Sequence, residues 1–218
     1  LESLKKYFKK IDIQKIDDVL LEEILFESVI LDDWVKAESV SSILLNRDKN
    51  NFSANFFKTF NGLITNKNID IYLENIGFEY LDINFLKAIR IWKSFDQKYI
   101  TNEKPENCIP IVCLHMAISL TIRGDIIKAQ EYYRNIEKEE FSSYRIKELL
   151  LLNSIESERD EAIEYVKQLN EHDLNLKNFD INYFKKNKYL LNPVENKTHG
   201  MAEVLYNISS WFYSKDLY

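Results

Sequence analysis

Histidine and cysteine are the side chains best suited to acid–base, nucleophilic or metal-binding roles, and this chain has few of them. Its three histidines are His115, His172 and His199. They lie in separate segments, and none belongs to an H-E-x-x-H pattern, in which two histidines one helical turn apart bind zinc. We therefore expect His115 to be a positioned surface side chain, with contact to a bound ligand as the alternative.

The two cysteines, Cys108 and Cys113, are five residues apart with Pro110 between them. On a single helix this spacing separates two side chains by about 140°, because a turn takes 3.6 residues. Two cysteines are also too few for a disulfide framework. We expect two separate core thiols that neither form a disulfide nor share a metal ion.

The acidic pairs Asp17-Asp18, Glu22-Glu23 and Asp32-Asp33 lack the spacing of a calcium-binding loop, and helix capping or solvated faces explain them better. The chain has only four glycines and contains no P-loop, no G-x-G-x-x-G and no G-x-S-x-G. We therefore expect no metal, no cofactor and no catalytic residues.

Composition and charge narrow the class of protein further. The net charge of −6 is spread evenly and leaves no basic cluster of the kind that binds nucleic acid. The longest apolar stretch, residues 109–122, contains a histidine and is too short to cross a bilayer. We expect no membrane span and favour a cytoplasmic protein, with a periplasmic one as the alternative if a signal peptide was removed.

The elements that must position these residues are helices. With 45% apolar residues, four glycines and three prolines, the chain favours a helical fold over a turn-rich β fold. No segment shows a convincing strand alternation. Apolar residues recur at helical spacing in several segments, and Pro110 suits a first turn while Gly124 suits a helix end. The predicted helices span 19–31, 34–45, 52–65, 110–124, 125–138, 143–155, 159–170 and 201–213, with ambiguous helical tendency over 69–100.

Small residues recur at fixed places in these helices. The chain has only seven alanines, and Ala129 and Ala162 are 33 residues apart. Ala117 lies before the turn at Gly124, and Ala37 repeats the position of Ala129 in an earlier unit. Residues 113–136 in this way resemble one tetratricopeptide repeat (TPR), a 34-residue helical hairpin whose small residues let two helices approach closely.

The resemblance to the TPR family, as in bacterial TPR-containing proteins, is closest over residues 108–170. It is also good over 18–66 and 200–218, and weak over 67–107 and 171–199. It implies an all-α, right-handed superhelical solenoid of antiparallel helical hairpins. Residues 1–218 would form one array of about five to six hairpins that ends within a repeat of a longer protein. An unrelated helical bundle and other hairpin solenoids, such as half-TPR or Sel1-like repeats, are the alternatives.

In the TPR family the first helices of successive hairpins line a concave groove that binds peptides or partner helices. By this resemblance the groove would be lined here by Glu22, Phe26, Val29, Ile30, Leu114, His115, Ile118, Thr121, Tyr144, Lys147, Leu151 and Tyr206. These side chains are mostly aliphatic or aromatic, which favours an apolar or amphipathic segment. The family's carboxylate clamp is expected to be absent, since only Lys147 and Asn207 would suit it.

The resemblance implies a non-catalytic scaffold or adaptor for a protein or peptide partner. The alternative is an accessory helical domain of a larger enzyme whose catalytic domain lies outside these residues. An enzyme active within residues 1–218 has little support. The last helix would leave Leu205, Ile208 and Phe212 partly uncovered, which suggests self-association as a further role.

Overall fold

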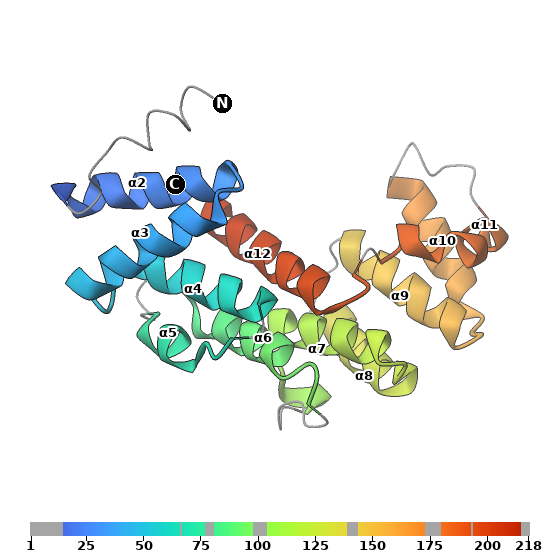
Figure 1. Ribbon diagram of the computed structural model, residues 1–218. Coiled ribbons are helices and arrows are strands. Elements are labelled where there is room, and N and C mark those ends of the chain that lie inside the picture. Colours follow the sequence, from blue (N-terminus) through green and yellow to red (C-terminus); the bar gives the residue numbers. More distant parts are fainter. Residues whose placement is uncertain are drawn as a thin grey trace. The chain divides into compact units, whose positions relative to one another are not determined.

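The computed structural model describes residues 15–65, 67–76, 81–97, 104–138, 144–172, 180–192 and 194–214. Within these ranges the chain is helical and contains no strand, which confirms the predicted all-α class (Figure 1). The helices group into two compact units, Leu1–Asp82 and Ile83–Tyr218.

The first unit packs its helices in chain order. Its helices are α2 (Asp18–Ile30), α3 (Trp34–Arg47), α4 (Phe52–Ile64) and α5 (Asp70–Asn75). Each packs on the next, and α2 and α3 share the largest interface (Figure 1). Their common core consists of Leu21, Ile24, Leu25, Ala37, Val40, Leu44, Ala54 and Phe57.

The second unit begins with the same sequential packing. Its elements are α6 (Ile83–Lys93), the 3-10 helix η2 (Pro105–Asn107), α7 (Pro110–Ile122), α8 (Ile126–Lys138), α9 (Tyr144–Glu156), α10 (Glu161–His172), α11 (Ile181–Lys186), the 3-10 helix η3 (Lys188–Leu190) and α12 (Lys197–Ser214). The hairpins α7–α8 and α9–α10 are the most extensively packed pairs, and α6 and α9 pack on α7 and α8 respectively. The eight helices predicted from apolar spacing are all present, while α11 had no predicted counterpart.

Three hairpin turns end their first helix in the same way. After α2, α7 and α9 one residue adopts a positive φ: Asp32 at 58°, Gly124 at 81° and Glu158 at 54°. After α7, the Gly124 amide donates to the carbonyl of Thr121, and the Asp125 amide donates to that of Leu120, both at 3.0 Å. This double hydrogen bond is the Schellman motif, and the turns after α2 and α9 repeat it.

The alanines predicted to lie where helices touch are all buried. Ala37, Ala117, Ala129 and Ala162 each have 0% exposure. Capping by the Asp32-Asp33 pair also forms as predicted, because the Asp33 carboxylate accepts a hydrogen bond from the Lys36 amide at 3.2 Å. The Asp125 carboxylate likewise accepts one from the Lys128 amide at 3.4 Å. Local signals in the sequence therefore place the turns and the tightest contacts correctly.

The last helix, α12, does not pack on the helix before it in the chain. It returns to α6 and α7 and runs antiparallel to α6 (Figure 1). Lys197 forms an ion pair with Asp96 at 3.3 Å, and the rings of Trp211 and Phe85 meet edge to face with centroids 5.7 Å apart. Between these two contacts Gly200 lies against Trp92, where a Cβ atom would overlap the indole ring.

This arrangement bears on the expectation that Leu205, Ile208 and Phe212 are partly uncovered on the last helix. Ile208 is 2% exposed, and Leu205 and Phe212 are half-buried. Met201 and Val204 are buried too. The expectation of partial exposure is therefore wrong for Ile208, while Leu205 and Phe212 remain partly exposed.

The structure also overturns the prediction of two separate core thiols. Cys108 and Cys113 form a disulfide, with Cα atoms 5.6 Å apart. The prediction placed both residues on one helix, but α7 begins only at Pro110. Cys108 has an extended backbone, with φ −85° and ψ 142°, so the angular spacing of a helix does not apply to the pair.

Candidate functional site

The residues predicted to line a groove are divided between the two units. On α2, Phe26 is 66% exposed, Ile30 is 60% exposed and Val29 is at the edge of exposure, while Glu22 is half-buried. The α2 candidates are therefore largely available to a partner.

Most of the candidates on α7 and α9 are not available. Exposure is 2% or less for Leu114, His115, Ile118 and Leu151. Helix α7 is packed between α6 and α8 and also contacts α12, so it has no open face for these side chains. Leu151 belongs to the core between α9 and α10. For these four residues the expectation of an open groove is corrected.

The remaining candidates are distributed over three helices, α7, α9 and α12. Thr121 is half-buried and donates a hydrogen bond to the carbonyl of Ala117 at 2.9 Å, while Lys147 is half-buried on α9. Tyr206 is 68% exposed on α12. Tyr144 begins α9, and its side chain lies outside the described residues.

Of the predicted groove residues that the structure describes, the exposed ones are Phe26, Val29 and Ile30 on the outer face of α2 and Tyr206 on α12. The inner face of α2 carries Leu21, Ile24, Leu25 and Ser28, all buried. On the opposite side Val19, Phe26 and Ile30 recur at intervals of seven and four, so they form one stripe along the helix. Val19 is 73% exposed. A surface helix normally turns apolar residues to one side only, and α2 carries them on both.

Carboxylates border this stripe. Helix α2 contains Asp18, Glu22, Glu23 and Glu27 and has no basic residue. Asp18 pairs with Arg47 at 2.7 Å, and Glu22 accepts a hydrogen bond from Asn51 at 2.6 Å. Among the described residues no cation pairs with Glu23 or Glu27. Glu23 and Glu27 therefore leave negative charge at the border of the stripe that no cation in the described residues neutralises.

His115 is a core residue rather than a surface one. The Trp92 indole donates a hydrogen bond to His115 Nδ1 at 3.1 Å, and both side chains are fully buried. Burial lowers the pKa of His115 to about 3, so the ring is neutral near neutral pH. Its proton is then on Nε2, which has no hydrogen-bond partner in the described part of the chain. A neutral, enclosed imidazole of this kind does not serve acid–base catalysis.

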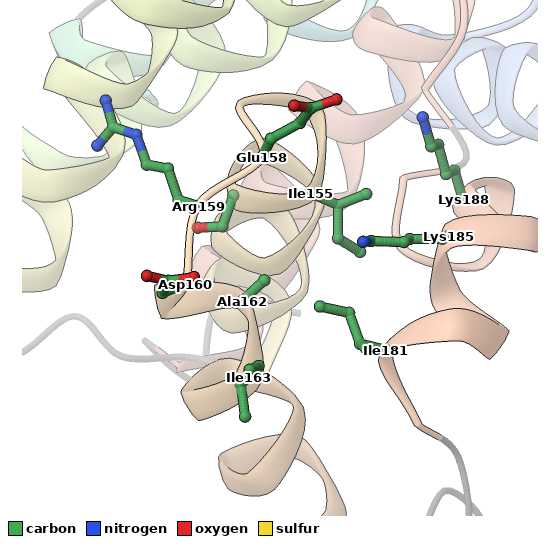
Figure 2. A pocket seen from close by; sticks show the side chains of 10 residues that line it. Ile155, Glu158, Arg159, Asp160, Ala162, Ile163, Ile181, Lys185 and Lys188 are labelled. Atoms are coloured by element: carbon green, nitrogen blue, oxygen red, sulfur yellow. The ribbon is translucent and has the colours of Figure 1, made fainter.

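A second feature is a hollow of about 520 Å³ at the turn between α9 and α10, next to α11 (Figure 2). Ile155, Ala162, Ile163 and Ile181 supply its apolar lining. Figure 2 shows Lys185 directed toward Ile155, while Arg159 and Asp160 point away from it. Lys188 is held by Glu156 at 2.7 Å. Among the described residues that line the hollow there is no histidine or cysteine.

The described segments hold no group of three His, Cys, Asp or Glu side chains that would bind a metal ion. Nor does any helix in those segments combine the length and apolar character that a bilayer crossing requires. The sequence does contain a signal for the α2 surface, because apolar residues occur on every side of the helix predicted over residues 19–31. The hollow joins two segments about 25 residues apart and has no comparable signal.

Comparison with known proteins identifies no relative: no protein-family model, no curated protein and no solved structure matches the chain.

Proposed function

We propose that this chain is a non-catalytic, TPR-like helical-repeat module that binds a protein partner as a scaffold or adaptor. The observation that carries the proposal is the apolar stripe of Val19, Phe26 and Ile30, which stays exposed although the opposite face of α2 already forms the core. Contiguous exposed apolar surface on a folded protein commonly marks a protein interaction site.

The internal repetition supports the repeat-module part of this proposal. The positive-φ residues Gly124 and Glu158 are 34 residues apart, which equals the length of one TPR. A fully buried alanine follows each turn, Ala129 after the first and Ala162 after the second. Such repeats pack mainly on their neighbours and leave helix faces for ligands.

The proposal is tested by chemical cross-linking and native affinity capture with the full chain. The F26S/I30S variant removes two large apolar side chains from the stripe. The I127S variant is the matched control, because Ile127 is 75% exposed on α8, in the other unit. We expect a protein captured by the wild type to be lost from F26S/I30S and kept by I127S. Capture that is equal in all three proteins would contradict the assignment to α2.

A further inference from the structure

Resting on the proposed function, we propose that the outer face of α2 binds a partner segment that folds as a basic amphipathic helix. In such a segment an apolar stripe meets Val19, Phe26 and Ile30, and flanking Lys or Arg side chains meet the acidic border of α2.

The shape of the stripe favours a helix over an extended strand. From Val19 to Ile30 it covers about 16 Å, or three helical turns, at 1.5 Å per residue. An extended peptide gains affinity by pairing with free backbone groups of a strand edge. The backbone groups of α2 are used within the helix, so side chains alone make the surface. A partner helix with apolar residues at intervals of three, four and seven matches side chains spaced in this way.

The negative charge of α2 favours a partner with positive charge. Four acidic residues and no basic residue are present in its 13 positions. Glu23 projects beside the stripe, between Val19 and Ile30, and Glu27 lies further round the same side, because successive residues turn by about 100°. Neither of these two carboxylates has an ion-pair or hydrogen-bond partner among the described residues. Opposite charge at the border of an apolar contact speeds association and rejects partners of the wrong sign.

The test uses two labelled synthetic peptides of about 18 residues, long enough to form a helix on binding. One peptide has Leu at intervals of three and four residues, so that the Leu side chains share one helix face, and has Lys at the flanking positions. The other peptide has Glu in place of each Lys. Binding to the full chain is measured by fluorescence anisotropy at low and high ionic strength. We expect the Leu/Lys peptide to bind about tenfold or more tightly than the Leu/Glu peptide, with a preference that weakens in salt.

Variants locate the binding and its charge dependence. F26S/I30S is expected to weaken binding of the Leu/Lys peptide about tenfold, as the loss of two apolar anchors predicts. E23K/E27K is expected to reverse the order of the two peptides. I127S is the control for apolar loss, and E131K is the control for charge, since Glu131 is exposed on α8. Both controls should bind as the wild type does.

Four results overturn this inference. Equal binding of the two peptides would mean that charge does not select the partner. Equal weakening by E131K and E23K/E27K would assign the binding to the net charge of −6 rather than to α2. Binding that appears only after Lys5, Lys6, Lys9 and Lys10 are changed to Ser would mean that the chain's own first residues, and not a partner, occupy this surface. If the peptides fail while native capture still depends on Phe26 and Ile30, the proposed function stands and only the partner class falls.

Discussion

The Trp92 indole donates its hydrogen bond to His115 Nδ1 at 3.1 Å, and the two rings meet edge to face with centroids 6.2 Å apart. Both lie at 0% exposure, where α6 and α7 pack together and α12 covers α6. His115 therefore accepts a hydrogen bond within the core, and protonation of its ring is coupled to unfolding.

The first prediction concerns the dependence of stability on pH. The pKa of His115 is about 3 in the folded protein, below its ordinary value of 6.5, so the unfolded state binds a proton first as the pH falls. Its stabilising contribution is complete above pH 6.5 and decreases below it. Between pH 6 and pH 4 the free energy of unfolding should fall about 1.4 kcal/mol per pH unit faster in the wild type than in H115Q.

Urea unfolding at several pH values measures this difference. The glutamine side chain introduced by H115Q would still accept a hydrogen bond from the indole but would not titrate in this range. H199Q is the control, because His199 is exposed. Parallel pH profiles of the wild type and H115Q would contradict the enclosed position of the imidazole.

The second prediction concerns the docking of α12. Alanine favours helix over glycine by about 1 kcal/mol, so G200A should stabilise a helix that has free space. Here a Cβ atom would overlap the Trp92 ring, and we expect a net loss of about 1–3 kcal/mol instead. Thermal unfolding and a red shift of tryptophan emission report the change. S209A, at an exposed position of α12, should have little effect.

The third prediction compares two hairpin turns. Glu158 and Gly124 both have positive φ, a conformation that costs a non-glycine residue about 1 kcal/mol. E158G should therefore stabilise the protein by about 1 kcal/mol, and G124A should destabilise it by about the same amount. No atom lies within 4 Å of a Cβ built on Gly124, so the loss there reports the backbone alone. Unchanged denaturation midpoints in both variants would contradict the turn geometry.

The fourth prediction concerns a polar link between α3 and α4. Lys58 Nζ lies 2.6 Å from Glu38 Oε1 and 2.9 Å from Ser42 Oγ, and Asn61 donates to Glu38 Oε2 at 3.0 Å. Burial by itself raises the pKa of Glu38, but the hydrogen bonds from Lys58 and Asn61 and the charges of Lys58 and Lys67 together hold the pKa below its ordinary value. The stabilisation by Glu38 is therefore present near neutral pH and is lost as the pH falls through its folded pKa.

We expect K58M to lower the free energy of unfolding by about 1 kcal/mol at pH 7, a modest value because the Glu38 side chain is 40% exposed. The difference between the wild type and E38Q should shrink as the solution is acidified below pH 4.5. K167M is the control, since Lys167 pairs with Glu164 at 3.9 Å on an exposed surface. Equal effects of K58M and K167M would contradict the link.

The fifth prediction concerns the disulfide. Closing the short loop between Cys108 and Cys113 should contribute about 2 kcal/mol through the unfolded state. Oxidised protein should take up no maleimide label when unfolded, and a reductant should lower its denaturation midpoint. The C108A/C113A variant should not respond to the reductant. Full labelling of the purified, unreduced protein would contradict the pairing.

The helices, their turns and the small buried residues were predictable from the sequence. Apolar periodicity, the caps Asp33 and Asp125 and the glycine at position 124 are signals read within a few residues of one another. Each of these features depends on local geometry, which a sequence pattern records directly. The exposed candidates Phe26 and Ile30 came instead from the resemblance to the TPR family.

Contacts between distant segments were not predictable in this way. The sequence pattern of α7 is equally compatible with a groove and with a core, and its packing between α6 and α8 is what encloses His115. The ion pair of Lys197 with Asp96 joins residues 101 positions apart, and Gly200 looks like a weak helix position until Trp92 is beside it. Periodicity shows which side of a helix is apolar. What covers that side depends on the packing of the whole unit, because burial is a property of neighbours in space.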